Sequence, residues 1–350
     1  MVSWMSTATS GPKARLHDVS GAAFIPRVVV VGGGFPGLYA LGYLRRLLAP
    51  SQAELVLVAP ADYLLYSPLL PDVATGTLNP RDIAVSLRQT LRGVRPVFGH
   101  ATEVDLGART VNVRGQNGDT ATERWDRMIL APGSVTRQFH IPGLAEHGHG
   151  LKTIEEALFL RDHVLAQLDL ADSLPATDAG RAERQERLTV VSVGAGYIGT
   201  EFIAQMQHWT QTIAERWDSF KVAETKWLLV DLADQILPEL GARVAHDAAR
   251  LLTERGIEIR LGTTVAMASA TSVTLTDGSV IPTRTLVWSA GVSPSPLIAT
   301  LGLPTEHGRL VVDAELAVPG ATHVWAAGDA AAVPDLVQRR RGNAARSSEP

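Results

Sequence analysis

The sequence predicts an α/β protein whose sheets are mostly parallel, and three observations lead to this prediction. Strand-like runs of β-branched residues alternate with amphipathic helical stretches along nearly the whole chain. The chain has 350 residues, of which 45% are hydrophobic, so it can bury at least two cores and we expect two domains. A glycine-rich signature occurs twice, which indicates that the two halves repeat one type of unit.

The predicted strands are short and rich in Val, Ile, Leu and Thr. In chain order they are 27–31, 54–58, 110–113, 128–134, 187–193, 226–230, 272–276, 285–290 and 321–329. Helical periodicity is clear in residues 38–48 and 153–170. Residues 171–187 are polar and show no periodicity, so we expect them to form a link before the second half of the chain.

Composition excludes several classes of protein. The net charge is −4 and Lys and Arg are scattered, so we do not expect a nucleic-acid-binding protein. The chain has no Cys, which excludes disulfides, iron–sulfur clusters, thiolate zinc sites and a redox-active Cys pair. The sequence has no run of about 18 apolar residues, so we expect no transmembrane helix. The His residues show no metal spacing, so no metal site is expected, and His147 and His149 are expected on a solvated loop.

The first glycine signature lies in VVVVGGGFPG, residues 28–37, between an apolar strand and a helix. Gly32 permits the sharp turn, Gly34 lets a pyrophosphate approach the backbone, and Gly37 lets the helix pack close to the strand. The helix N-terminus then offers free N–H groups and a partial positive charge to the phosphates. Pro36 differs from the commonest sequence, but Pro is tolerated in the first turn of a helix.

The second signature is LTVVSVGAGYIGTEF, residues 188–202, in which Gly194, Gly196 and Gly199 repeat the same spacing. One such signature alone is weak evidence, because glycine-rich turns are common. Two copies, each between an apolar strand and a helix, predict two dinucleotide-binding domains and two bound nucleotides.

A carboxylate at the end of the second strand of each unit would bind the adenosine ribose. Asp231 has this position in the second unit, where it would also repel a 2′-phosphate and so favour NADH over NADPH. In the first unit, Ala59 stands where the acid is expected. Asp62 follows three residues later, and two roles stay open for it: binding the ribose, or capping a turn.

Two further segments complete the pattern, because MILAPGS (128–134) and ATHVWAAGD (321–329) are strands that end in glycine-containing turns. The order of these strands and the two glycine signatures resembles the two-dinucleotide-binding-domain flavoproteins, the pyridine nucleotide-disulfide oxidoreductase superfamily. Within it, YSPLLPDVATGTLNPRDIAVSLR (66–88) is similar to the type II NADH:quinone oxidoreductases, also called alternative NADH dehydrogenases. The resemblance covers residues 26–335. The lack of Cys agrees with it, because the disulfide reductases of this fold need a Cys pair and the type II enzymes use no thiol.

The resemblance implies an α/β fold of two Rossmann-like dinucleotide-binding domains, with the NADH domain inserted in the FAD domain. The boundaries that we expect are a flexible N-terminal segment 1–25, the first part of the FAD-binding domain 26–150, the NADH-binding domain 151–305, the second part of the FAD-binding domain 306–335 and a disordered tail 336–350.

The activity that the resemblance implies is FAD-dependent oxidation of NADH, with electron transfer to a quinone and without proton pumping. It also implies a cytoplasmic protein at the cytoplasmic face of the cell membrane, with peripheral membrane contact as in the family, and a homodimer. Two alternatives stay open. One is a ferredoxin- or rubredoxin-reductase-like NADH flavoprotein, against which the 66–88 segment argues. The other is a catalytically silent nucleotide-binding remnant.

By resemblance, FAD is bound by residues of the first turn and of later segments, with Asp329 on the ribityl chain. The full FAD set is Gly32, Gly34, Phe35, Gly37, Asp62, Thr75, Val104, Ala131, Gly133, Gly328 and Asp329. NADH is bound by Gly194, Gly196, Tyr197, Ile198, Gly199, Asp231, Ala290 and Gly291.

Glu201 is the one catalytic candidate, because the corresponding position in the family faces nicotinamide and flavin. A carboxylate near an aromatic cofactor and away from water can have a raised pKa and shuttle protons. The other interpretation is that an acid in the first helical turn complements the helix dipole, which is worth about 0.3–1 kcal/mol.

The resemblance ends soon after Asp329. The relatives continue with a segment that lines the quinone site and a domain that dimerises and anchors to the membrane, whereas residues 336–350 are polar and Arg-rich. Two explanations stay open: a truncated or frame-altered gene product, or a natural variant that borrows the missing piece from a partner. We expect the C-terminally truncated chain to retain FAD weakly and to reduce quinone poorly.

Overall fold

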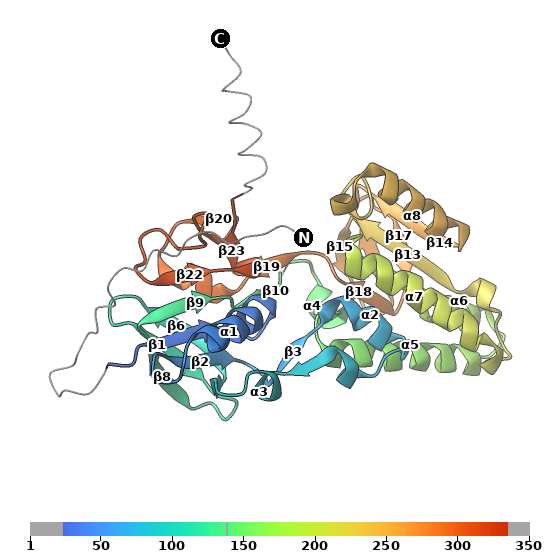
Figure 1. Ribbon diagram of the computed structural model, residues 1–350. Helices are drawn as coiled ribbons and strands as arrows, with labels where there is room; N and C mark the ends of the chain where they lie inside the picture. Colours follow the sequence, from blue (N-terminus) through green and yellow to red (C-terminus); the bar gives the residue numbers. More distant parts are fainter. Residues whose placement is uncertain (1–23, 138, 335–350) are drawn as a thin grey trace, which may run out of the picture.

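The computed structural model describes residues 24–137 and 139–334, which form two domains (Figure 1). The expected N-terminal segment 1–25 lies outside the described residues except for its last two positions, and the expected tail 336–350 lies outside them entirely. None of the helices in the described part of the chain is long and apolar enough to cross a lipid bilayer.

The first domain is built on a five-stranded sheet with the order β22-β9-β1-β2-β5. All neighbouring pairs of this sheet are parallel. The strands are β1 (Arg27–Val31), β2 (Glu54–Ala59), β5 (Arg95–Phe98), β9 (Arg127–Leu130) and β22 (Val324–Ala326). The register pairs Val31 with both Val58 and Leu130, so the carboxyl ends of these strands meet at one edge. That edge is where nucleotides bind in sheets of this type.

The strand order of this sheet confirms the prediction that the second domain is inserted in the first. β9 and β22 are neighbours in space although almost 200 positions separate them in the sequence, and the second domain lies in the chain between them. Helix α1 (Phe35–Leu47) follows β1, close to the predicted 38–48. The other small elements of this domain are the antiparallel strands β6 (His100–Asp105), β7 (Thr110–Arg114) and β8 (Thr120–Arg124), the strands β20 (Thr305–Glu306), β21 (Arg309–Val311) and β23 (Ala331–Ala332), and helix α3 (Leu87–Thr90).

The second domain repeats the architecture with a parallel sheet of order β11-β18-β12-β13-β14. Its strands are β11 (Gly148–Gly150), β12 (Thr189–Val193), β13 (Lys226–Asp231), β14 (Ile257–Leu261) and β18 (Thr285–Trp288). Its longer helices are α5 (Ile154–Ser173), α7 (Tyr197–Ile213) and α8 (Ala242–Glu254), and the short α4 (Leu144–His147) precedes β11. Strands β15 (Val265–Ala268), β16 (Ser272–Leu275) and β17 (Val280–Pro282) form a separate antiparallel sheet. The predicted fold of two related α/β domains is therefore confirmed.

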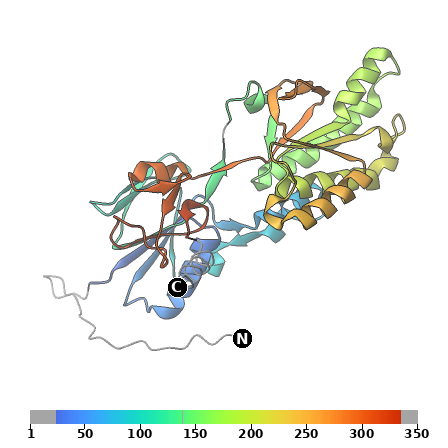
Figure 2. The same ribbon diagram turned by 90° about the horizontal axis from the view of Figure 1, so that it is seen from above.

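Two chain crossings connect the domains and pair with each other as short antiparallel strands, β10 (Ser134–Thr136) and β19 (Val292–Pro294). Figure 2 shows the domains side by side with these crossings between them. A third connection comes from the 66–88 segment, which contains α2 (Leu70–Ala74) and β4 (Ala84–Ser86) and follows directly on β3 (Tyr63–Leu65), the strand that pairs with β4. Helix α2 packs against α5 and α7, so this segment of the first domain is anchored in the core of the second.

The expectation of a polar link at 171–187 is wrong, because these residues contain the end of α5 and a helix, α6 (Asp178–Arg187). Oγ1 of Thr177 caps this helix by accepting a hydrogen bond from the backbone N–H of Gly180 at 3.1 Å. Arg184 donates to the carbonyl oxygen of Ala171 at 3.0 Å, which ties α6 to α5. This helix is held by polar contacts and not by an apolar stripe, so the sequence shows no hydrophobic periodicity there.

The expectation of a solvated loop is also wrong for His149. It lies in β11, and its ring packs against the rings of Phe159 and His163 at centroid distances of 4.8 and 4.9 Å. Burial, with a smaller contribution from the neighbouring imidazoles of His163 and His147, lowers the pKa of His149 to about 4. This imidazole is therefore a packing group of the second domain.

Candidate functional site

The first glycine turn has a backbone that only glycine accommodates well. Gly32 has φ +114°, and a Cβ there would overlap the carbonyl oxygen of Ala131. A Cβ at Gly37 would overlap the carbonyl oxygen of Gly32, so α1 can pack this close to the turn only without a side chain. No described protein atom lies within 4 Å of a Cβ built on Gly34, so the space beside this residue is open to a ligand.

The second turn repeats this geometry position by position. Gly194 has φ +109°, a Cβ at Gly199 would overlap the carbonyl oxygen of Gly194, and the described chain leaves the space beside Gly196 open. The acid at the end of β13 is part of this turn. Oδ2 of Asp231 accepts a hydrogen bond from the backbone N–H of Ala195 at 2.5 Å, and its Oδ1 accepts one from Ala233 at 2.8 Å.

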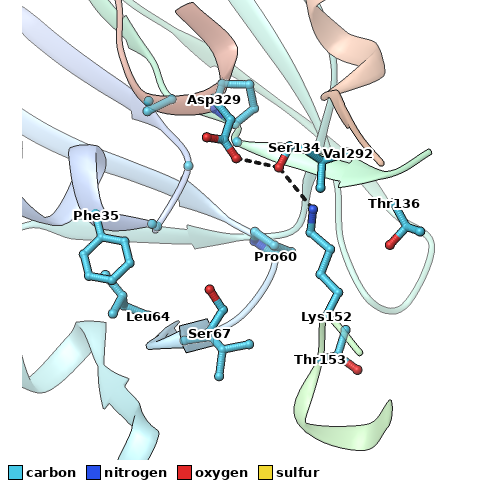
Figure 3. A pocket seen from close by; sticks show the side chains of 18 of the residues that line it. Phe35, Pro60, Leu64, Ser67, Ser134, Thr136, Lys152, Thr153, Val292 and Asp329 are labelled. Carbon is cyan, nitrogen blue, oxygen red and sulfur yellow. Dashed lines mark hydrogen bonds between the residues drawn. The ribbon is translucent and has the colours of Figure 1, made fainter. Parts of the chain in front are cut away.

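A cavity of about 690 Å³ lies between the domains, at the carboxyl edge of the first sheet (Figure 3). Its volume falls within the usual range of about 300–1,000 Å³ for small-molecule and cofactor sites. Residues from both domains line it. Those that the sequence predicted are Gly32, Gly34, Phe35, Ala131, Gly133, Ile198, Gly291, Gly328 and Asp329.

The remaining predicted NADH residues surround the second turn beside this cavity. They are Gly194, Gly196, Tyr197, Gly199, Asp231 and Ala290. Ile198 and Gly291 are their chain neighbours and do line the cavity, so the second turn is adjacent to the space that the first turn faces.

Four predicted FAD residues do not line the cavity: Gly37, whose place in the turn is given above, and Asp62, Thr75 and Val104. Oδ1 of Asp62 accepts a hydrogen bond from the backbone N–H of Arg88 at 2.8 Å, which is a capping contact at the start of α3. Thr75 is buried at the end of α2, where its hydroxyl donates to the carbonyl oxygen of Asp72 at 3.1 Å. The side chain of Val104 is part of the hydrophobic core of the first domain. Ala59, the last residue of β2, lines the cavity, so the ribose-binding acid expected at the end of this strand is replaced by a methyl side chain.

Glu201 lies on α7 one turn after Ile198, and therefore on the same helix face as a cavity residue. Burial raises the pKa of its carboxyl group, and the negative charge of Asp72 on α2 raises it further. A carboxyl group with a raised pKa beside a cavity is the setting expected for proton transfer, although the side chain itself does not line the cavity.

A hydrogen-bonded network that the sequence analysis missed lies in the wall of the cavity (Figure 3). Nζ of Lys152 donates to Oγ of Ser134 at 3.1 Å, and that hydroxyl donates to Oδ2 of Asp329 at 2.6 Å. The three residues come from the start of α5, from β10 and from the turn after β22. No sequence spacing relates them, so only the folded chain reveals the network.

The residues present suit two dinucleotides. Each turn combines a tight glycine bend, an open side for phosphates and a following helix N-terminus, which together form an anion-binding site. The cavity between the turns is large enough for the reactive ring of a cofactor. Within residues 24–137 and 139–334, no three His, Asp or Glu side chains are grouped closely enough to hold a metal ion.

Comparison with known proteins agrees with this geometry. The family model described as "Pyridine nucleotide-disulphide oxidoreductase" matches residues 26–344. The type II NADH:quinone oxidoreductase NdhA of Mycobacterium tuberculosis is 34% identical over 324 residues, which are 89% of this chain and 67% of that protein. The demethylphylloquinone reductase NdbB of Synechocystis is 31% identical, over 87% of this chain and 72% of that protein.

The structure of NDH2 from Plasmodium falciparum in complex with NADH superposes with a TM-score of 0.80 at 20% identity, and the match covers 92% of this chain and 68% of that one. At this identity the superposition shows a common fold. The family model and the two bacterial relatives together establish that the chain belongs to the pyridine nucleotide-disulphide oxidoreductase family and, within it, to the type II NADH:quinone oxidoreductases.

Proposed function

We propose that this chain oxidises NADH with FAD as its cofactor and passes the electrons to a quinone, without pumping protons. The observation that carries the proposal is the pair of equivalent glycine turns, one in each domain, that flank one interdomain cavity. The names of the relatives support the choice of substrates, since they are quinone oxidoreductases that use NADH or reduce a phylloquinone derivative.

The first domain would hold FAD. The open side of Gly34 and the N-terminus of α1 would bind the pyrophosphate, and Asp329 the ribityl chain. Bound FAD supplies the redox chemistry, because a flavin takes up a hydride and releases its two electrons to an acceptor. The protein would position the two nucleotides on either side of the interdomain cavity.

The second domain would hold NADH at its own turn. Asp231 would accept hydrogen bonds from the ribose hydroxyls and repel a 2′-phosphate, which favours NADH over NADPH. Its carboxylate already fixes the Ala195 amide of the turn, so one acid would shape the phosphate site and read the ribose. Ile198 and Gly291 then mark the side on which the nicotinamide approaches the cavity.

Glu201 would handle the proton that accompanies electron transfer to the quinone. Partial burial and the charge of Asp72 raise its pKa, which lets the carboxyl group be protonated closer to neutral pH than a fully solvated Glu, although Glu201 remains exposed to solvent in the structure. The other interpretation, an acid that complements the helix dipole from the first turn, does not fit the structure, because α7 begins at Tyr197 and Glu201 lies beyond its first turn.

The proposal includes a location and an assembly. A lipid-soluble quinone is reached from the membrane surface, so we place the enzyme at the cytoplasmic face of the cell membrane, in peripheral contact with it. We also propose a homodimer. Sedimentation of the purified protein with and without lipid vesicles tests both parts.

Steady-state kinetics with three acceptors tests the activity. The proposal predicts that NADH oxidation is faster with a short-chain naphthoquinone or ubiquinone than with ferredoxin. Ferredoxin reduction faster than quinone reduction would support the ferredoxin-reductase alternative. Absence of NADH oxidation with every acceptor, including ferricyanide, would show a silent nucleotide-binding protein.

A further inference from the structure

The cavity between the domains has one positively charged side chain among its described lining residues, Lys152, and one negatively charged side chain, Asp329. The rest of the lining consists of glycines, apolar side chains and a few hydroxyl groups. Opposite charges in such a wall act strongly on any ligand whose own charge changes, because the apolar surroundings screen them less than water does.

The ammonium group of Lys152 is held in one place. Its Nζ donates to Oγ of Ser134, and Ser134 donates to Oδ2 of Asp329, so a neutral hydroxyl bridges the two charges. A lysine ammonium has three N–H donors, and the described chain provides a partner for one of them. The others remain for a ligand in the cavity.

The backbone of Lys152 is fixed as well. Its N–H donates to Oε2 of Glu156 at 2.6 Å, and the next residue, Thr153, is the N-cap of α5 in a capping box with the same Glu156. The N-terminus of this 20-residue helix adds a partial positive charge beside the lysine. Burial lowers the pKa of Lys152 below its usual range, and the nearby carboxylates of Asp329 and Glu156 offset part of this decrease.

We propose that Lys152 sets the reduction potential of the bound FAD, by placing its ammonium group where the flavin ring gains negative charge. The inference rests on the proposed function. A hydride carries two electrons and one proton, so its transfer from NADH adds one negative charge to the ring and leaves NAD⁺. A fixed cation next to the ring stabilises that charge and makes reduction more favourable.

Ser134 and Asp329 would be positioning residues for this effect. The Ser134 hydroxyl bridges the Lys152 ammonium group and the Asp329 carboxylate by hydrogen bonds, so it fixes the position of the ammonium group in the cavity wall. The competing interpretation is structural: the network ties the β10 crossing to the turn after β22 and has no effect on the flavin. A substitution that keeps the hydrogen bond and removes the charge separates the two.

The test is the midpoint potential of the bound FAD, measured by anaerobic spectroelectrochemistry on the full-length protein. Lys152→Gln keeps a hydrogen-bond donor without charge, Lys152→Met removes both, and Lys152→Arg keeps the charge. We expect Lys152→Gln and Lys152→Met to lower the ratio of reduced to oxidised flavin at a given potential at least tenfold, which is about 30 mV for a two-electron couple. Lys152→Arg should stay within threefold of the unsubstituted protein.

Lys226→Met is the matched control, because Lys226 is an exposed lysine at the start of β13 that does not line the cavity. It should leave the potential unchanged. If a variant loses FAD, the ratio of its dissociation constants for oxidised and reduced FAD reports the same shift. An unchanged potential or ratio in Lys152→Gln overturns the inference, as does an equal shift in Lys226→Met.

The outcomes also separate this inference from the proposed function. If the unsubstituted protein takes up no FAD, the proposed function fails and the inference fails with it. If the protein binds FAD that NADH reduces, but Lys152→Gln has the same potential, only the role of Lys152 is wrong.

Discussion

The backbone N–H of Ala195 donates a 2.5 Å hydrogen bond to Oδ2 of Asp231, across 36 positions of sequence. This contact joins the end of β13 to the glycine turn that follows β12, so the acid stabilises the phosphate site even before a nucleotide binds. Because Asp231 also ends the strand where a ribose is expected, its substitution affects two parts of nucleotide recognition together.

Asp231→Asn should therefore weaken NADH binding and reduce discrimination against NADPH. A hydrogen bond to a charged group contributes about 1.5–3 kcal/mol, so we expect KM for NADH to rise roughly tenfold or more. The FAD spectrum should not change, because FAD binds at the other turn. Asp247→Asn on the exposed face of α8 is the control. An unchanged KM for NADH would contradict the assignment of the second turn.

Gly34→Ala should lower FAD affinity without unfolding the protein. No described atom lies within 4 Å of the added Cβ, so the methyl group would occupy space that a phosphate needs. We expect a loss of about 1–3 kcal/mol, or roughly fivefold to 150-fold in the dissociation constant for FAD. Titration of the apoprotein with FAD, followed by flavin fluorescence, measures it.

Gly37→Ala and Gly196→Ala are the companion variants. At Gly37 the Cβ would overlap the carbonyl oxygen of Gly32, so this variant should lower the unfolding temperature as well as FAD binding. At Gly196 the space is open, and this variant should keep its flavin and bind NADH less tightly. Loss of FAD from Gly196→Ala with normal NADH binding would mean that the two turns have been assigned in the wrong order.

Glu201→Gln should slow quinone reduction about a hundredfold if this carboxyl group transfers a proton, as general acid–base groups typically contribute about 10²–10⁴-fold. The charge of Asp72 raises the pKa of Glu201, so Asp72→Asn should move the limb of the pH–rate profile that reports Glu201 to lower pH. If Glu201→Gln leaves both the turnover and the pH–rate profile unchanged, Glu201 does not transfer the proton.

His149 should make the stability of the protein sensitive to mild acid. Its pKa is about 4 in the folded protein and about 6.5 when the chain is unfolded, so the unfolded state binds more protons between these pH values. Stability is complete above about pH 6.5 and falls as the pH decreases towards about 4. After allowance for solvent screening, we expect a loss of about 1–2 kcal/mol.

His149→Phe removes this titration and can still pack against Phe159. Urea unfolding at pH 7 and pH 5 should show a smaller decrease in stability for this variant than for the unsubstituted protein. His208→Gln, at an exposed position of α7, is the control. An equal decrease in His149→Phe would show that other groups cause the acid sensitivity.

The features that backbone conformation determines could be predicted from the sequence. Glycine at positions 32, 37, 194 and 199 is required by a positive φ or a close approach of chain segments, and such requirements appear directly in the spacing of a signature. The central strands β1 and β12 are continuous runs of buried, mostly β-branched residues, which makes them easy to recognise. The strands β5, β11 and β14 lack such runs and were not predicted.

The features that depend on tertiary contacts could not be predicted. Ser134 and Asp329 are 195 positions apart, and Lys152 joins them only because α5 begins at the crossing between the domains. For Asp62 the sequence allowed either ribose binding or capping of a turn. Its capping contact depends on the position of α3, which no local sequence pattern specifies. Helix α6 was missed because its contacts to α5 are polar.

Anaerobic titration of the purified, FAD-supplemented protein with NADH tests the central claim most directly. If both turns hold their nucleotides next to the shared cavity, one equivalent of NADH should bleach the flavin absorbance near 450 nm, and an added quinone should restore it. A protein that takes up no FAD, or whose bound flavin stays oxidised with excess NADH, would contradict the account.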